Sequence, residues 1–245
     1  MMIVNIFARI GHHPLHEFQQ TPEELVDVME KYGIDRTFVH PFPTMKVKEN
    51  NDLIAKAVSM YPEMLTGFMG INPGDDGAMA EVERAVKMGL KGVMVDVEFH
   101  ALFGRSLPNL ETLIVPCMDH DLPVLFNTEN IHILTRPEPY FKGLDQLAFK
   151  FPDVRMVVSQ YWPRIGELMR EHRNIILYTG GHQNTPGTIP QLNELGPTRI
   201  CLGTESPVNH PALFIKDLRL KKIPEPYREM ILGKNALRLF WDLLE

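Results

Sequence analysis

Residues 1–13 read MMIVNIFARIGHH, and the apolar, β-branched run inside them predicts a strand over residues 3–10. Runs of the same kind recur after it, separated by segments with helical periodicity. The further predicted strands cover residues 37–41, 65–71, 92–97, 123–126, 155–159, 175–178 and 199–203. Strands that alternate with helices at a repeat of roughly 30 residues are typical of a (β/α)8 barrel, also called a TIM barrel.

Helix-start signals support this alternation. In TPEELVDVMEKYG (residues 21–33), Thr21 is the expected N-cap, Pro22 is the first helical residue, and Glu24 stands three residues after the cap. Gly33 suits the end of this helix. Three further helices are expected: one starting on the Asn or Asp of NDLIAKAVSMYP (residues 51–62), one in GAMAEVERAVKMG (residues 77–89) that ends at Gly89, and one in YREMILGKNALRLF (residues 227–240). The competing fold, an open doubly wound sheet, usually carries a glycine-rich phosphate fingerprint, which this chain lacks.

The composition is that of an ordinary globular protein. Of the 245 residues, 44% are hydrophobic and 23% charged, and no linker rich in Gly, Ser or Pro divides them, so we expect one domain over residues 1–245. The net charge is −6 without a basic block, which argues against nucleic acid and anionic membrane as partners. No apolar run reaches the length of a membrane span and no secretory signal is visible, so a cytoplasmic location is expected.

Longer segments of the chain resemble a known family. NNDLIAKAVSMYPEMLTGFMGINPGD (residues 50–75), VERAVKMGLKGVMV (82–95), LGTESP (202–207) and GKNALRLF (233–240) are similar in order and spacing to the amidohydrolase-related family. That family includes aminocarboxymuconate-semialdehyde decarboxylase and related hydrolases and decarboxylases. LGTESP resembles its G-S-D-x-P motif and GKNALRLF its closing G-x-N-A-x-R-L-F motif. The resemblance implies a single amidohydrolase-like (β/α)8 barrel, in agreement with the strand pattern.

The chain departs from this family where the family binds a divalent metal ion. The two metal-binding histidines of the family's first strand, D-x-H-x-H, correspond here to Phe7 and Arg9. The histidines of its fifth and sixth strands correspond to Asn127 and Gln160, and the aspartate of its eighth strand corresponds to Glu205. A phenylalanine offers no ligand atom, a guanidinium is permanently cationic, and amides are weak ligands for zinc-like ions. The resemblance therefore implies the barrel with a degenerate metal site, and we expect no metal ion and no other cofactor there.

A relocated metal site is an alternative. His12, His13 and His16 directly follow the first predicted strand, and His100 follows the fourth. Adjacent side chains on a strand point to opposite faces, so His12 and His13 reach one pocket together only from a loop. The simpler interpretation is a polar loop with solvated histidines.

Arg9 and Glu205 are the first two candidate catalytic residues. They end the first and the eighth predicted strands, which are neighbours once the barrel closes, at the face where the active sites of such barrels lie. A guanidinium in place of the metal ion could pair with Glu205 or bind a substrate carboxylate through its bidentate fork. The alternative is that the pair only fills the mouth of the barrel.

Other polar residues are expected to line the same mouth. Asp96 is the third catalytic candidate, because it shares a strand face with Glu98 and precedes His100, a set suited to general acid–base work. The candidates for substrate binding are Asn127, Gln160, His40, His100, Glu129 and His182. Each of them has a simpler interpretation as a solvated or loop-capping residue.

Three hypotheses on function follow. Some relatives in the amidohydrolase superfamily act without a metal ion on lactones, so the first hypothesis is a metal-independent hydrolase or lyase for a small carboxylated or lactone substrate. The second is an inactive paralogue that binds a small acid or assembles with an active partner, and the third is a metal-dependent hydrolase with the relocated site. We also expect a homodimer, as is common for this family and for soluble oligomers. Candidates for its apolar contacts are Tyr140, Phe141, Trp162 and Trp241.

Overall fold

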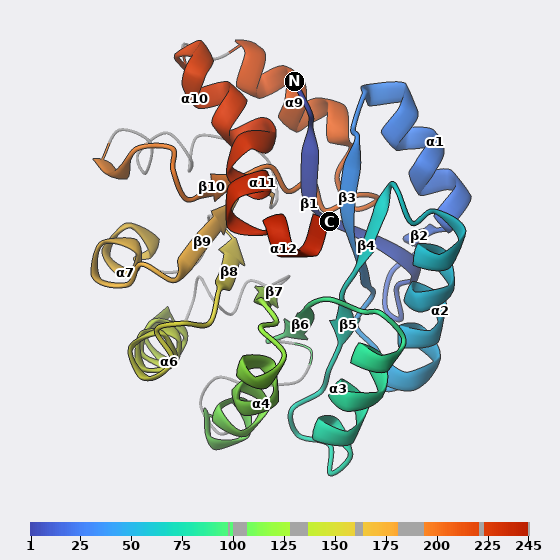
Figure 1. The fold of residues 1–245 in the computed structure, drawn as a ribbon, viewed down its shortest axis with the longest axis vertical. Coiled ribbons are helices and arrows are strands. Elements are labelled where there is room, and N and C mark those ends of the chain that lie inside the picture. Colours follow the sequence, from blue (N-terminus) through green and yellow to red (C-terminus); the bar gives the residue numbers. More distant parts are fainter. Residues whose placement is uncertain are drawn as a thin grey trace.

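A computed structural model describes residues 1–97, 99, 107–127, 137–159, 164–180, 194–220 and 223–244. Its strands lie within two residues of the predicted runs, except that the run 65–71 is divided into two strands and that no run predicts the short strand at residues 19–20. The strands form the inner ring that Figure 1 shows. They are β1 (Val4–His12), β2 (Gln19–Gln20), β3 (Arg36–Pro41), β4 (Leu65–Gly67), β5 (Met69–Gly70), β6 (Val93–Asp96), β7 (Val124–Asn127), β8 (Met156–Ser159), β9 (Ile175–Tyr178) and β10 (Ile200–Cys201).

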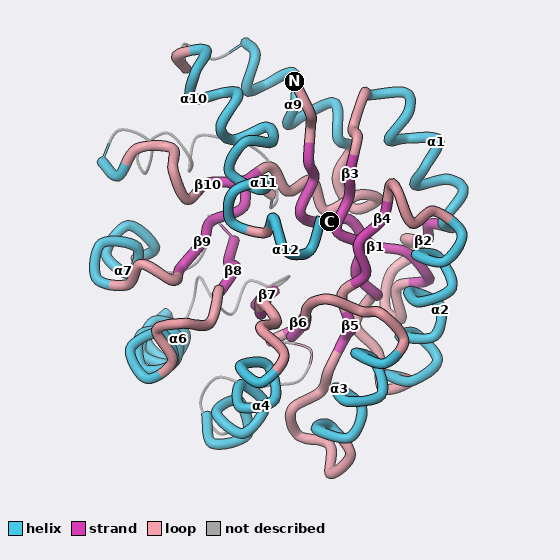
Figure 2. The backbone as a smooth tube through the Cα atoms, in the orientation of Figure 1, coloured by secondary structure: helices cyan, strands magenta, loops and turns pink. Residues whose placement is uncertain are grey.

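The strands close into a barrel. They form two hydrogen-bonded sets, β2-β1-β3-β4 and β10-β9-β8-β7-β6-β5, in which all pairs are parallel except β1 with β2. The sets join at one seam where the Phe68 amide donates to the Val39 carbonyl (2.9 Å), and at the other where the Ile6 amide donates to the Leu202 carbonyl (2.8 Å). Figure 2 shows the strands inside and the helices outside, so the predicted (β/α)8 barrel is confirmed.

The helices are α1 (Pro22–Tyr32), α2 (Val47–Met60), α3 (Ala78–Lys87), α4 (Leu107–Asp119), α6 (Pro137–Lys150), α7 (Ile165–Glu171), α9 (Pro211–Leu220), α10 (Glu225–Glu229), the π-helix η2 (Met230–Lys234), α11 (Asn235–Leu239) and α12 (Trp241–Leu244). The caps predicted for α1 are confirmed. The Thr21 hydroxyl accepts from the Glu24 amide (3.2 Å), the Glu24 carboxylate accepts from the Thr21 amide (2.8 Å), and Gly33 ends the helix with φ 65°.

Two helix boundaries differ from the prediction. Helix α2 begins at Val47, one turn earlier than expected, because Asn51 makes tertiary contacts instead of a cap: its Nδ2 donates to Glu81 (2.8 Å) and its Oδ1 accepts from the Gly70 amide (2.9 Å). The predicted closing helix is divided by η2, where the backbone approaches the first strand so closely that a Cβ on Gly233 would lie 2.0 Å from the Met2 carbonyl oxygen.

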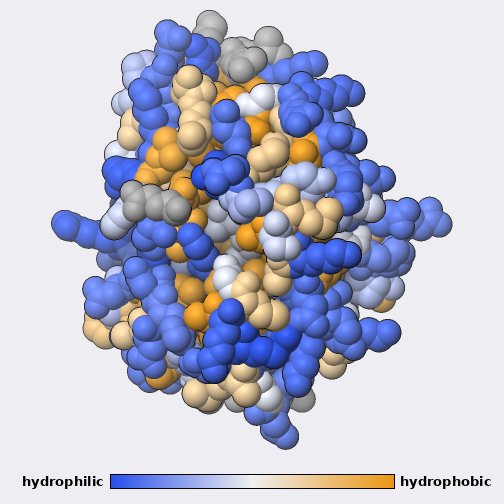
Figure 3. Space-filling model, turned by 45° about the vertical axis from the view of Figure 1, so that its right-hand side comes forward, coloured by the Kyte–Doolittle hydropathy of each residue, from blue (hydrophilic) through white to orange (hydrophobic). Residues whose placement is uncertain are grey.

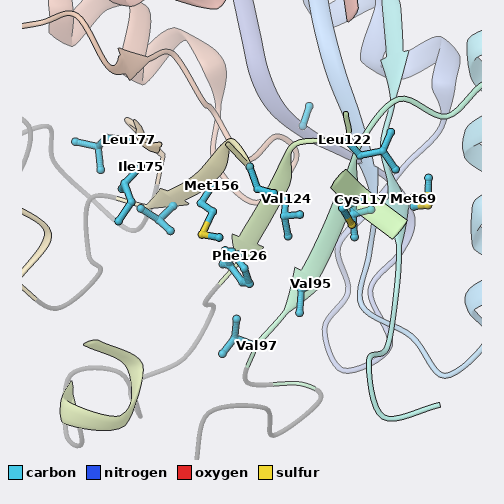
Figure 4. Close-up of a cluster of buried hydrophobic side chains, with 14 of the residues drawn as sticks. Met69, Val95, Val97, Cys117, Leu122, Val124, Phe126, Met156, Ile175 and Leu177 are labelled. Atoms are coloured by element: carbon cyan, nitrogen blue, oxygen red, sulfur yellow. The ribbon is translucent and has the colours of Figure 1, made fainter. Parts of the chain in front are cut away.

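Two apolar clusters hold the barrel together. The outer cluster packs the strands against the helices, and Figure 4 shows its members from β6 to β9, among them Val95, Phe126 and Met156. The inner cluster fills the barrel with alternate residues of the same strands, including Met94, Leu125, Val157 and Ile176. Ala236 of α11, Leu243 of α12 and Phe240 between them belong to this inner cluster, so the two helices cover the end of the barrel where the strands begin.

The exterior is mainly polar. Figure 3 shows one face of the molecule, where hydrophilic residues predominate and apolar residues show in smaller areas between them. Among the described residues, no helix combines the length and the apolar composition needed to cross a bilayer.

Candidate active site

Polar side chains form a layer inside the barrel where the strands end. The outer cluster takes one side of β6 to β9, so by alternation Asp96, Asn127, Ser159 and Tyr178 face the interior. The strand register sets them at one level: Asp96 lies opposite Asn127, Ser159 lies opposite Tyr178, and the β7–β8 register puts Asn127 beside Ser159. Polar groups therefore replace the apolar filling at the carboxyl ends of these strands, which is where barrels of this kind place their active sites.

Arg9 brings a buried cation to this layer. Its side chain is only 1% exposed, and its Nη2 lies 3.1 Å from Asp96 Oδ1, while Nη1 donates to the Pro41 carbonyl (2.9 Å). The guanidinium carbon also lies 5.1 Å from the ring centroid of Phe7 and 5.5 Å from that of Phe42. Carboxylate, carbonyl and aromatic faces thus compensate the lost hydration of the cation.

A chain of hydrogen bonds continues from this ion pair. Asn127 Nδ2 donates to the same Asp96 oxygen at 2.6 Å, which turns the Asn127 carbonyl oxygen toward Tyr178. The Tyr178 hydroxyl lies 3.5 Å from that oxygen and donates at 2.9 Å to Glu205 Oε1. The structure therefore links Arg9 to Glu205 through three side chains. The direct contact between Arg9 and Glu205 stays a prediction.

Glu205 is held at the rim of the barrel. Its second carboxylate oxygen accepts from Asn209 Nδ2 at 3.1 Å, and its amide donates to the Phe7 carbonyl at 2.8 Å. Its φ of 53° lies in the left-handed region, which is uncommon for a residue other than glycine and is often found at functional sites. The residue is half-buried, so the carboxylate joins the interior layer to the surface of the mouth.

His40 is buried in strand β3 and does not cap a loop. Its ring packs against Phe7 and Phe68, and Nε2 donates to the Ile6 carbonyl (3.2 Å), whereas Nδ1 has no hydrogen-bond partner among the described residues. The pKa of His40 is lowered to about 3, mainly by complete burial and in smaller part by the nearby charge of Arg9, while the bond to Ile6 acts in the opposite direction. His40 is therefore neutral at physiological pH.

Several predicted residues lie outside the described residues. They are Gln160, His100, Glu129, His182, Glu98 and Trp162. Of the predicted site, the structure brings together Arg9, Asp96, Asn127, His40 and Glu205.

The sequence matches the amidohydrolase family over residues 10–241. The chain belongs to this family. No protein with a curated description matches it significantly. Among solved structures it is similar to 2,6-dihydroxybenzoate decarboxylase from Rhizobium (TM-score 0.76, 16% identity, 98% of each chain).

Two further structural neighbours were solved with bound ligands. A dihydroxybenzoic acid decarboxylase from Polaromonas sp. contains manganese and the inhibitor 2-nitroresorcinol (TM-score 0.72, 17% identity, 98% of this chain and 97% of that one). A probable 2-pyrone-4,6-dicarboxylic acid hydrolase from Acinetobacter baumannii contains citric acid (TM-score 0.70, 14% identity, 98% and 100%). At these identities the similarity establishes the shared fold.

The described residues that the resemblance aligns with the family's metal ligands are poor ligands for a divalent ion. Phe7 packs its ring against His40 and Tyr178, Arg9 contributes a positive charge, and the amide nitrogen of Asn127 points to Asp96. Of the described residues that align with the family's metal ligands, Glu205 alone has an anionic oxygen. A cation placed beside a guanidinium would also be repelled by it.

The relocated metal site finds no support among the described histidines. His12 is exposed, and His13 is buried with Nδ1 accepting from the amides of Leu15 (3.0 Å) and His16 (3.1 Å). Within the described ranges, the group of three residues close enough to share an ion is Asp145, Glu171 and His172, on and after helices α6 and α7.

Sequence reasoning missed three residues of this site. Ser159 and Tyr178 end strands that were predicted correctly, and their alternation with Val157 and Ile176 would have shown that they face inward. Asn209 follows Glu205 in a turn, and no pattern in the sequence indicates its contact.

Proposed function

We propose that this protein is a metal-independent hydrolase, or lyase, that acts on a small carboxylated or lactone substrate at the mouth of the barrel. The observation that carries the proposal is the buried guanidinium of Arg9, linked to the half-buried carboxylate of Glu205 in place of a set of metal ligands. The structural neighbours support the substrate class, because their names refer to hydroxybenzoic acids and to a pyrone dicarboxylic acid.

The geometry favours hydrolysis of a lactone. Arg9 would polarise the carbonyl oxygen of the substrate, which acquires negative charge when water attacks. Glu205 would take the proton of that water as a general base, with Tyr178 and Asn209 fixing one carboxylate oxygen each. The new bond joins the water oxygen to the carbonyl carbon, the ring C–O bond breaks, and the proton passes to the leaving alkoxide. Asp96 holds the guanidinium in place throughout.

A second candidate is a protein that binds a small acid without converting it. This alternative is favoured by the pairing of Arg9 with Asp96, because a neutralised cation polarises a carbonyl less than an unpaired one does. Binding without turnover would separate this candidate from the first.

The test measures turnover with and without a metal chelator. The purified protein is assayed with 2-pyrone-4,6-dicarboxylate and 2,6-dihydroxybenzoate, and its metal content is determined. We expect lactone hydrolysis that a chelator leaves unchanged and that Arg9→Met or Glu205→Gln lowers at least about 100-fold. Glu63→Gln, at an exposed carboxylate, is the matched control. Stoichiometric transition metal whose removal abolishes activity would refute metal independence.

A further inference from the structure

The hydroxyl of Ser159 is buried in the polar layer. The residue is 1% exposed, and its Oγ makes no hydrogen bond within the part of the chain that the structure describes. Buried hydroxyls are normally hydrogen-bonded, because leaving one unpaired costs roughly 1–3 kcal/mol. Val157, two residues before Ser159 on β8, also faces the interior and is apolar, so this face of the strand accommodates an apolar side chain. The serine therefore needs an explanation other than packing.

The position of Ser159 points to a bound ligand. It lies between Asn127 and Tyr178 at the same level of the barrel. Both neighbours direct their donors to protein carboxylates: Asn127 Nδ2 to Asp96 and the Tyr178 hydroxyl to Glu205. The Ser159 hydroxyl differs from them, because no acceptor among the described residues takes its hydrogen bond.

We infer that Ser159 is a further ligand-binding residue, whose hydroxyl donates to a carboxylate or lactone carbonyl oxygen of the ligand. The inference rests on the proposed function for the class of ligand. The expected partner is an acceptor oxygen of the ligand. The surrounding layer already contains two acceptors, the carboxylates of Asp96 and Glu205, so a hydroxyl donor is the group that binding of an acid requires in addition.

The test replaces Ser159 by cysteine and uses a small acid as the probe. Iodoacetate and iodoacetamide both alkylate a thiolate, forming a bond from sulfur to the methylene carbon with loss of iodide, and they differ in the carboxylate. Cys117 and Cys201 belong to the two apolar clusters, where burial raises the pKa of each to about 12, so the native background is low. Ser159 lies in the polar layer instead, next to Asn127 and Tyr178. Ser59→Cys, at an exposed position on α2, gives the ratio of the two rates for a solvated thiol.

We expect Ser159→Cys to be labelled in the folded protein, with a rate ratio of iodoacetate to iodoacetamide at least about threefold above that of Ser59→Cys. No labelling above the wild-type level until the protein is denatured would overturn the inference, and so would an equal ratio in the two variants. Neither readout depends on turnover, so the inference and the proposed function fail separately. If Ser159→Cys does not fold, a crystal structure of the wild type decides: Ser159 Oγ bonded to solvent or an acid in the mouth supports the inference, and a protein partner refutes it.

Discussion

At the scale of single residues, the ion pair of Arg9 and Asp96 determines how much substitutions in the mouth lower the free energy of unfolding. Both side chains are almost completely buried, at 1% and 6% exposure. Removing one partner leaves an uncompensated charge, which costs about 3–5 kcal/mol in such pairs, whereas removing both leaves none. We expect Arg9→Met and Asp96→Asn each to lower the free energy of unfolding by that amount, and the double variant to lose clearly less than the sum.

A double-mutant cycle by urea denaturation measures this coupling. The exposed pair of Lys142 and Glu138, at 4.0 Å, is the control and should show little coupling. Strictly additive effects of Arg9→Met and Asp96→Asn would show that the contact does not stabilise the barrel. Glu205→Gln, combined with Arg9→Met, tests the predicted direct pair in the same way.

His40 makes a separate prediction at this scale. Its pKa is lowered from 6.5 to about 3 in the folded protein, so between these values the unfolded chain binds a proton that the folded protein does not. Stability contributed by the neutral ring is present above pH 6.5 and is lost as the pH falls toward 3, by up to about 1.4 kcal/mol per pH unit. His40→Gln should therefore flatten the decrease in stability between pH 7 and pH 5 relative to the wild type. His12→Gln, at an exposed position, is the control, and an unchanged slope in His40→Gln would contradict the prediction.

At the scale of secondary-structure elements, helix α1 offers the clearest test of local sequence signals. Thr21 and Glu24 satisfy each other's backbone amides in a capping box, and both residues are exposed and outside the polar layer of the barrel. Thr21→Ala should lower the free energy of unfolding by about 1 kcal/mol and leave ligand binding unchanged. Ser59→Ala, near the end of α2, is the matched control, and equal stabilities of the two variants would show that the cap contributes nothing.

The same element shows how far the sequence alone could predict the fold. Periodicity and caps located α1 and the barrel strands correctly, because these signals act between residues a few positions apart. They placed the start of α2 one turn late, since Asn51 bonds to Glu81 and Gly70, which are distant in sequence. The sequence predicts Glu205 as the partner of Arg9 and does not indicate Asp96 for the same reason: which carboxylate lies against the guanidinium depends on register and side-chain direction across the barrel.

At the scale of the whole molecule, the family relationship and the site give different information. The match over residues 10–241 fixes the fold, and the barrel then brings the ends of strands from the whole chain to one face. The chemistry depends on the few side chains there, in which this chain departs from the metal-binding pattern it resembles. In this chain the barrel presents the buried cation of Arg9, held by the carboxylate of Asp96 and the carbonyl of Pro41.

Self-association is the last prediction at this scale. Tyr140 and Phe141, two of the residues considered for a dimer contact, are packed in the core at 8% exposure each, so they do not contribute to an interface. Trp241 remains a candidate because it is 60% exposed on α12, at the end of the barrel opposite the mouth. A large exposed aromatic residue is a common anchor of an interface.

We expect sedimentation at micromolar concentration to give the mass of a dimer and Trp241→Ser to shift this mass toward that of the monomer. Phe149→Ser, at a residue 80% exposed on α6, controls for the loss of any exposed aromatic side chain. A monomeric wild type would refute the dimer, and a dimer unaffected by Trp241→Ser would place its interface elsewhere.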